Sequence, residues 1–271
     1  MVPPSAVLFP ERGGKLAALG SLRAPSRHNG YVAPTDVLTV TLRVKRFNPE
    51  VDRKPHWQEF TVEDMTPGDR VLDALHQVKW FEDGTLAFRR SCAHGVCGSD
   101  AMVVNGENAL ACQVLLGDAG TDITVEAIRG LPVVKDLVVD MAPFFAQYRS
   151  VLPWLLTPTD DPGYGERRQS PEDRERFDDT TKCILCAACT TSCPVFWTNG
   201  SYVGPAAIVQ AHRFIFDSRD AGTSERLDVL GDRTGVWRCR TAFNCTNACP
   251  RGIKVTQAIQ EVKRVILADR A

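Results

Sequence analysis

The sequence predicts an α+β chain in which a small mixed sheet with one helix across it precedes a helical region. Apolar and polar residues alternate over 38–45 and over 123–127, with the period of two typical of a strand that buries one face. Apolar residues recur at helical spacing over 71–78 and 255–266. From about residue 132 onward we expect helices and cysteine loops rather than strands.

Residues 37–130 are expected to form the sheet and its helix. The dipeptides Asp83-Gly84 and Asn105-Gly106 are hairpin signals, because a two-residue hairpin turn needs residues that accept positive φ. The expected order is strands over 38–45 and 57–62, a helix from about 69, strands over 102–104 and 109–112, and a strand over 123–127.

The remainder of the chain is expected to be helical. A connector rich in Pro, Gly and charge ends at Ser170-Pro171, which suits the N-cap and first position of a helix. Further helices are expected over 205–217 and 255–266. The predicted domains are a flexible N-terminal extension over 1–35, a first domain over 36–140, a connector over 141–175 and a second domain over 176–271.

The composition is ordinary, and the length suits roughly two domains. Of the 271 residues, 44% are hydrophobic, and 32 basic residues oppose 33 acidic ones, which gives a formal net charge of −1. Nucleic-acid binding is disfavoured, because neutralising phosphates takes a clustered surplus of Lys and Arg. No window approaches the roughly 18 apolar residues that cross a bilayer, so we expect any membrane role to come through a partner subunit.

The N-terminal extension is rich in Pro, Gly, Ser and Ala, and its basic residues outnumber its single acid, Glu11. A secretory signal is not expected, because the apolar stretch 16–22 is short and is interrupted by Gly20. An Arg-rich, acid-poor start also suits an organellar transit peptide, which stays open as an alternative.

Ten cysteines could form five disulfides, but their spacing favours metal binding. Tight Cys-x2-Cys-x2-Cys runs gather sulfurs at one point, whereas disulfide frameworks join distant segments. The prediction is therefore metal ligation in a reducing compartment.

The first cysteine group fits the plant-type pattern of a [2Fe–2S] cluster at every position but one. Cys92 and Cys97 are followed by Asp100, where the pattern has its third cysteine, and then by Cys112. A carboxylate is a competent, though harder, iron ligand. We expect Asp100 to ligate the cluster; the alternative is an acid beside the cluster, with another group filling the site.

The second group is a bacterial two-cluster ferredoxin run, whose fourth sulfur binds the other cluster. It reads Cys183-x2-Cys186-x2-Cys189-x3-Cys193-Pro194. A matching run covers 239–250, with Ala242 where the middle cysteine should stand. Because each run gives its fourth sulfur to the other cluster, Cys183, Cys186, Cys189 and Cys249 are assigned to a [4Fe–4S] cluster. Cys193, Cys239 and Cys245 are left for a second cluster.

Three thiolates hold three irons, and Ala242 offers no atom to a fourth. The second cluster is therefore expected to be [3Fe–4S]; a [4Fe–4S] cluster with a water or hydroxide corner is the alternative. A four-cysteine zinc site is disfavoured, because it would leave the other three cysteines without a role. With no Gly-x-Gly-x-x-Gly fingerprint and no acid–base or nucleophile constellation, the chain is predicted to carry electrons and to have no catalytic residue.

These residues resemble those of the iron–sulfur subunits of succinate dehydrogenase and its sister fumarate reductase, and actinobacterial members are the most similar. The resemblance spans about residues 37–270. It rests on Arg-Arg-Ser-Cys-x4-Cys-Gly-Ser-Asp at 89–100, Arg-Gly-Leu-Pro-Val-x-Lys-Asp-Leu at 129–137, Cys-Ile-Leu-Cys at 183, Ser-Cys-Pro at 192, Gly-Pro-Ala at 204 and Ile-Phe-Asp-Ser-Arg-Asp at 215–220. It implies a β-grasp, plant-type ferredoxin-like domain followed by an all-α, bacterial ferredoxin-like domain.

The resemblance also implies partners and a direction of electron flow. In such complexes a flavoprotein subunit oxidises succinate at FAD. Electrons then pass through [2Fe–2S], [4Fe–4S] and [3Fe–4S] clusters to a quinone held against membrane-anchor subunits, which links the tricarboxylic acid cycle to the respiratory chain. The N-terminal domain would contact the flavoprotein and the C-terminal domain the anchor, at the cytoplasmic face of the bacterial inner membrane.

Family members contact quinone near the [3Fe–4S] cluster, and the matching residues here are Pro194 and Trp197. At 240, where several members carry a histidine, this chain has Arg240, which puts in question how the quinone is oriented and protonated. A core role for Trp197 is the alternative. Two other functions stay open: fumarate reduction by menaquinol, which shares every ligand named above, and a free ferredoxin-like carrier.

Overall fold

The computed structural model describes residues 37–157 and 166–269, all within one unit, Asp36–Ala271. The flexible extension predicted over 1–35 lies outside the described residues, and so does the stretch 158–165 of the predicted connector. Strands occupy the N-terminal part of the described chain and helices the C-terminal part, which confirms the α+β prediction.

The main sheet has five strands in the order β2-β1-β5-β3-β4. β1 pairs antiparallel with β2 and parallel with β5, while β3 pairs antiparallel with β4 and β5. Val40, Leu42 and Val44, alternate residues of β1, are fully buried, as the period of two predicts. The strands are β1 (Leu38–Arg46), β2 (His56–Met65), β3 (Ala101–Val104), β4 (Glu107–Leu110) and β5 (Asp122–Glu126).

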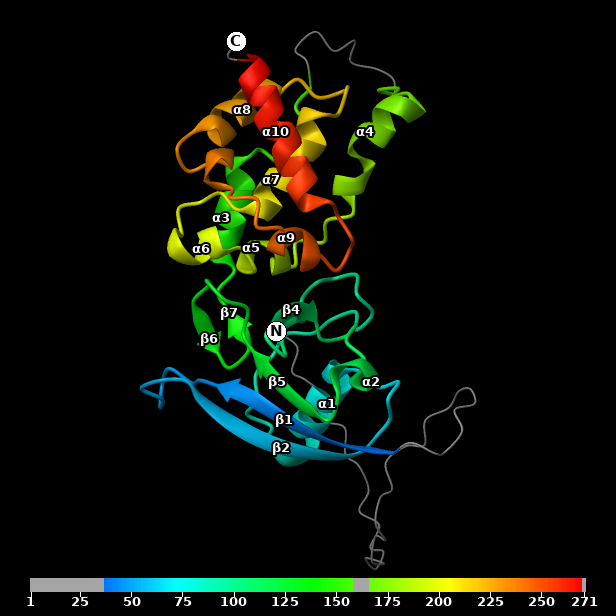
Figure 1. The fold of residues 1–271 in the computed structure, drawn as a ribbon, viewed down its shortest axis with the longest axis vertical. Coiled ribbons are helices and arrows are strands. Elements are labelled where there is room, and N and C mark those ends of the chain that lie inside the picture. The colour runs from blue at the N-terminus through cyan, green and yellow to red at the C-terminus, as the bar shows by residue number, and fades with distance from the viewer. Residues whose placement is uncertain (1–36, 158–165, 270–271) are drawn as a thin grey trace, which may run out of the picture. The chain divides into compact units, whose positions relative to one another are not determined.

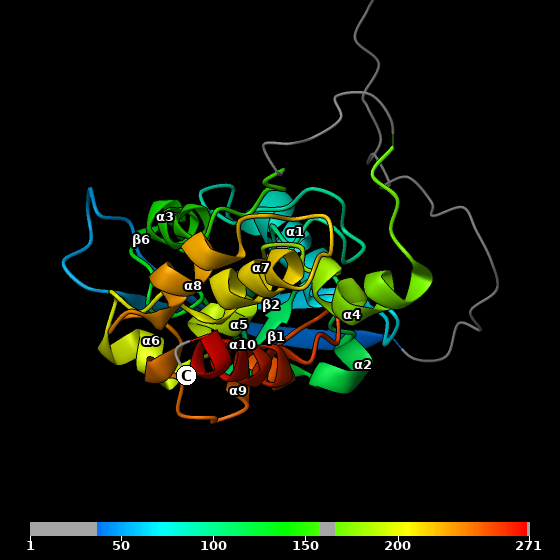
Figure 2. The same cartoon turned by 90° about the horizontal axis from the view of Figure 1, so that it is seen from above.

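One helix, α1 (Val71–Gln77), packs on the sheet and shares its core with β1 and β5 (Figures 1 and 2). A π-helical turn, η1 (Val78–Glu82), continues it. The hairpin predicted at Asp83-Gly84 is wrong, because these residues end that helical turn and no strand follows until β3. Asp83 instead accepts hydrogen bonds from the backbone and hydroxyl of Thr85, at 2.9 and 2.6 Å.

The second hairpin signal is confirmed. Asn105 and Gly106 have φ of 50° and 88°, both positive as a type I′ turn requires, and they join β3 to β4. A further hairpin of β6 (Val133–Lys135) and β7 (Val138–Val139) lies where no strands were expected. Strands of three and two residues are too short to produce a detectable alternation, so the sequence pattern missed them.

The helices that follow are grouped around α7 and α10 in Figure 1. Val255, Ile259, Val262 and Ile266 are each at most 1% exposed, so the predicted apolar face of α10 is its core face. The predicted cap of α4 is also confirmed, since the Ser170 hydroxyl accepts the Asp173 N–H at 3.1 Å. These helices are α3 (Ala142–Ser150), α4 (Pro171–Thr181), α5 (Ala188–Thr191), α6 (Pro194–Thr198), α7 (Pro205–Ile215), α8 (Thr223–Gly231), the 3₁₀ turn η2 (Val236–Arg238), α9 (Asn244–Asn247) and α10 (Val255–Asp269). A short helix, α2 (Leu116–Ala119), lies earlier in the chain, between β4 and β5.

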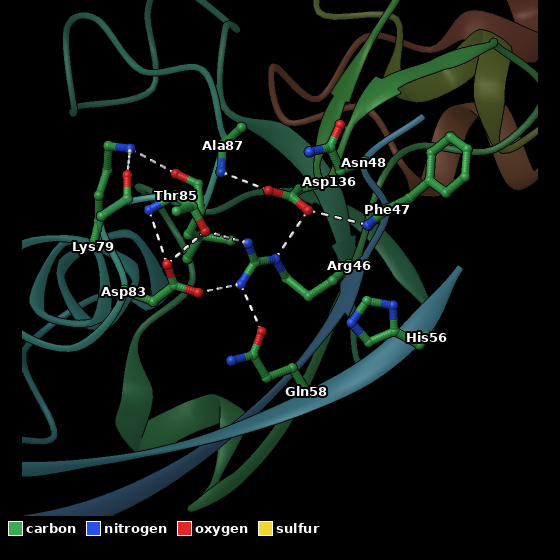
Figure 3. Close-up of polar contacts among 12 residues, drawn as sticks. Arg46, Phe47, Asn48, His56, Gln58, Lys79, Asp83, Thr85, Ala87 and Asp136 are labelled. Carbon is green, nitrogen blue, oxygen red and sulfur yellow. Dashed lines mark hydrogen bonds and ion pairs between the residues drawn. The ribbon is translucent and has the colours of Figure 1, made fainter. Parts of the chain in front are cut away.

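A buried arginine, Arg46, joins the end of β1 to the segment that leads to the first cysteine loop (Figure 3). Its guanidinium donates hydrogen bonds to Asp136 (2.9 Å), Asp83 (2.7 Å), Gln58 (2.6 Å) and Thr85 (3.0 Å). Bonds to two carboxylates compensate the loss of hydration that burying a guanidinium causes.

Asp136, at the turn between β6 and β7, completes this network (Figure 3). Its side chain is 1% exposed and also accepts the backbone N–H groups of Phe47 (3.1 Å) and Ala87 (2.9 Å). The carboxylate of Asp136 therefore connects three parts of the fold: the end of β1, the segment before the first cysteine loop, and the β6–β7 hairpin.

Replacing Asp136 by Asn should lower the free energy of unfolding by about 3 kcal/mol, because it removes one partner of a buried ion pair and leaves Arg46 undercompensated. Urea unfolding of the metal-loaded chain measures the effect. The control is Glu59→Gln, which breaks the exposed Arg43–Glu59 pair (3.0 Å) and should cost less than about 1 kcal/mol. Equal losses in the two variants would contradict a structural role for the Asp136 network.

Candidate metal centres

The second and third cysteine runs share one backbone shape. Leu185 and Ala187 have φ of 56° and 64°, and Thr241 and Phe243, the corresponding residues of the later run, have φ of 59° and 62°. Left-handed backbone costs a residue with a side chain roughly 1–2 kcal/mol, and such strain gathers at functional sites. A short helix follows in both runs, α5 in the first and α9 in the second. The repeated shape indicates two copies of one ligand loop.

Ala242 stands at the loop position that Cys186 occupies in the earlier run. Each of the two residues lies between two left-handed neighbours. The later loop therefore has the ligand shape but an alanine methyl where the earlier loop carries sulfur.

A first cavity is lined by four cysteines that come from both runs. Burial raises the pKa of the thiols of Cys183 and Cys186, the latter to about 12. Apart from Arg251 the other lining residues are apolar or aliphatic, so thiolates here need a bound cation to balance them. This donor set suits an iron–sulfur cluster. The four cysteines are Cys183, Cys186, Cys189 and Cys249.

A second cavity contains the remaining three cysteines of the runs, Cys193, Cys239 and Cys245. Ala242 lines the same cavity and supplies no ligand atom. The hydroxyl of Thr256, on α10, lies 3.6 Å from the sulfur of Cys245. The division of the seven cysteines into four and three, predicted from spacing, thus corresponds to two cavities in the fold.

The three residues predicted near the quinone fall into two groups. Pro194 and Arg240 line the three-cysteine cavity. Trp197 lines a different cavity of about 300 Å³, together with Arg129. Its indole N–H donates to the carbonyl of Thr191 at 2.6 Å, so that donor already has a partner inside the chain.

In the first cysteine loop, backbone groups surround the sulfur of Cys92. The N–H groups of His94 (3.5 Å), Val96 (3.4 Å) and Cys97 (3.3 Å) all point to it. These bonds stabilise the thiolate and lower the pKa of Cys92 to about 7. The loop is therefore arranged to hold a negatively charged sulfur.

Asp100 is 2% exposed and lies beside Cys112, whose backbone N–H it accepts at 2.6 Å. Burial and the neighbouring carboxylate raise the pKa of the Cys112 thiol to about 12. The backbone N–H of Gly95 also points to the Cys112 sulfur, which links the two halves of the group. A carboxylate and a thiol buried together repel when both are ionised, and a bound cation removes that repulsion.

Within residues 37–157 and 166–269, no three His, Cys, Asp or Glu side chains are close enough to hold a single metal ion.

The first loop touches the second run directly. Gly98 has φ of 68°, and a Cβ added to it would lie 2.6 Å from the Cβ of Cys186. Asn108, on β4, donates to the Ala188 carbonyl and the Thr191 hydroxyl of α5, both at 2.8 Å. Sequence reasoning missed these contacts, because no spacing pattern connects residues on separate loops.

The chain matches two domain families and several named proteins. The 2Fe-2S iron-sulfur cluster binding domain matches residues 41–146, and the 4Fe-4S dicluster domain matches residues 176–250. The succinate dehydrogenase iron-sulfur subunit of Coxiella burnetii is 42% identical over 232 residues, which cover 85% of this chain and 98% of the relative.

The chain belongs to the family of succinate dehydrogenase iron–sulfur subunits. The member from Paracoccus denitrificans is 44% identical over 83% of this chain and 86% of its own length. The mitochondrial subunit 1 of Oryza sativa is 43% identical over 97% and 94%. Among solved structures, a chain of the Mycobacterium smegmatis Sdh1 complex in the apo form superposes with a TM-score of 0.78 at 29% identity, covering 87% of this chain and 98% of that one.

Gly98→Ala should destabilise this iron–sulfur subunit more than Gly106→Ala. Both glycines have positive φ, 68° and 88°, but the space around Gly106 is open to 4 Å, whereas at Gly98 the new methyl would overlap Cys186. Each variant bears the backbone strain of roughly 1–2 kcal/mol, and only Gly98→Ala adds a steric collision. Thermal unfolding of the metal-loaded chain measures both. A smaller loss for Gly98→Ala would show that the two loops are not in contact.

Proposed function

We propose that this chain is the electron-transfer subunit of a succinate:quinone oxidoreductase, the respiratory complex II. It passes electrons from FAD of a flavoprotein subunit through [2Fe–2S], [4Fe–4S] and [3Fe–4S] clusters to a membrane quinone. The clusters supply one-electron redox chemistry when bound. The observation that carries the proposal is that three cysteine sites follow one another in space. The loop of the first site touches the four-cysteine site at Gly98 and Cys186. The four-cysteine and three-cysteine cavities are both built from the same two cysteine runs.

In this proposal each metal centre has its own ligands. Asp100 takes the place of a third cysteine, which its burial beside Cys112 supports. The absence of sulfur from Ala242 in the three-cysteine cavity supports a three-iron cluster. The ligands would be Cys92, Cys97, Asp100 and Cys112 for [2Fe–2S]; Cys183, Cys186, Cys189 and Cys249 for [4Fe–4S]; and Cys193, Cys239 and Cys245 for [3Fe–4S].

The finer description of the fold is part of the same proposal. The strand order β2-β1-β5-β3-β4 with α1 against the sheet supports a β-grasp ferredoxin-like domain over 36–140. The twin ligand loops among short helices support a bacterial ferredoxin-like domain over 176–271. Residues 141–175 would connect them; this stretch includes α3 and the start of α4.

Exposed aromatic side chains near the three-cysteine cavity support contact with an apolar membrane-anchor subunit. Phe243 lines that cavity and is 54% exposed, and Trp197 and Trp237, at 45% and 37%, flank the same runs. None of the helices in the described ranges is long and apolar enough to span a membrane. We place the quinone near Pro194, Trp197 and Arg240, and the subunit at the cytoplasmic face of the inner membrane, attached through the anchor.

Ala242→Cys should convert the three-iron centre to four irons, because the new thiolate would stand at the loop position of Cys186. Electron paramagnetic resonance of the oxidised complex measures this as loss of the three-iron signal. Ala242→Ser is the matched control, since it adds a side chain of similar size without a thiolate and should keep the signal. A three-iron signal that persists in Ala242→Cys would show that this side chain does not face the cluster.

The function itself is tested by isolating the complex from membranes through a tag on this chain. A flavoprotein and an apolar membrane protein should copurify, and the preparation should oxidise succinate with quinone as acceptor. Running the assay backwards with fumarate and menaquinol determines the preferred direction. A chain that purifies alone would instead be a free carrier, which would overturn the proposal.

A further inference from the structure

Tyr202 lies between α6 and α7, and its side chain is fully buried. Its hydroxyl has no hydrogen-bond partner among the residues that the structure describes. Burying a hydroxyl without a partner is unfavourable, so such a group in a folded protein calls for an explanation.

The ring of Tyr202 lines the cavity that contains Cys193, Cys239 and Cys245. A tyrosine phenol ordinarily titrates at about pH 10, so it carries its proton at neutral pH. The phenol of Tyr202 is a hydrogen-bond donor placed among three sulfur ligands.

Three of the other polar side chains around this cavity already have partners: Thr256, Thr241 and Asn244, whose amide donates to the Ser192 carbonyl at 3.3 Å. The hydroxyl of Thr256 is bonded to that of Thr246 at 2.8 Å, and the hydroxyl of Thr241 accepts from Gln260 at 3.2 Å. Val195, Pro205 and Ile259 line the rest of the wall without polar side-chain atoms. Arg240, the other polar residue on the wall, offers only hydrogen-bond donors. The acceptors that a bound cluster would bring to the Tyr202 hydroxyl are its sulfides.

We propose that the Tyr202 hydroxyl donates a hydrogen bond to a sulfide of the [3Fe–4S] cluster and thereby raises the reduction potential of that cluster. This inference rests on the proposed function, since it assumes that Cys193, Cys239 and Cys245 hold that cluster. Adding one electron makes the cluster more negative, and a hydrogen bond to a more negative acceptor is stronger. Tyr202 thus favours the reduced form and tunes the centre nearest the proposed quinone site.

The test is Tyr202→Phe in the intact complex, with the midpoint potential of each cluster measured by redox titration and electron paramagnetic resonance. The equilibrium constant for one-electron reduction of the three-iron centre should fall about tenfold, which is about 59 mV. The [2Fe–2S] potential should stay unchanged, because its proposed ligands lie on other loops. Tyr148→Phe removes the same atom from α3 and should shift none of the potentials.

A second variant separates tuning from packing. Placing 3-fluorotyrosine at 202 keeps the ring and the hydroxyl but makes the phenol more acidic and a stronger donor. The three-iron potential should then move upward, opposite to its shift in Tyr202→Phe. A role in packing alone predicts no movement with the fluorinated residue.

The outcomes distinguish this inference from the function on which it rests. A wild-type complex without a three-iron signal would refute the proposed cluster and with it the proposed function. A normal three-iron signal whose potential is the same in wild type, Tyr202→Phe and the fluorinated protein would overturn only the role of Tyr202. A shift confined to the [4Fe–4S] potential would also overturn it, since the hydroxyl would then face the neighbouring cluster.

Discussion

The approach of Gly98 to Cys186 is the constraint on which the rest of the arrangement depends. Electron transfer between metal centres weakens steeply with distance, and this contact brings the first cysteine loop next to the second cysteine run. Only a residue without Cβ fits between the two loops, and glycine adopts the positive φ found there without strain. The sheet positions the loop that contains Gly98, and the helices position the loop that contains Cys186. Asn108 adds a polar link between them at β4 and α5.

The support on the sheet side is electrostatic as well as apolar. Arg46 and Asp136 hold the segment that enters the first loop, and each is satisfied by several hydrogen bonds although both are buried. A well-paired buried charge fixes geometry more sharply than a methyl contact does, because its hydrogen bonds are directional. The position of the segment before the first cysteine loop is therefore fixed, and backbone N–H groups of that loop point to the sulfur of Cys92.

Much of this could be predicted from the sequence because it depends on local spacing. Strand β1 and helix α10 follow from the alternation and helical recurrence of their apolar residues, and the division of seven cysteines into four and three follows from the exchange of the fourth sulfur. The β6–β7 hairpin was missed because two or three residues show no period. The hairpin predicted at Asp83-Gly84 was wrong because the side chain of Asp83 accepts hydrogen bonds from Arg46 and Thr85. The Arg46 contact forms only in the folded chain. Tyr202 gave no signal at all, since its burial beside three sulfurs exists only after folding.

The four-cysteine cavity takes one of its sulfurs from Cys249, close to the end of the chain, and three from a run much earlier. During synthesis the earlier run leaves the ribosome before its fourth ligand has been translated. Domains fold as they emerge, so the sheet can be complete while the helical part still waits for its last segments. The cavity closes only when α9 and α10 have packed against α5 and α7. The proposed [4Fe–4S] cluster therefore lacks its full set of ligands until Cys249 has been translated, whereas the proposed ligands of the [2Fe–2S] cluster all lie within residues 92–112 and are translated earlier.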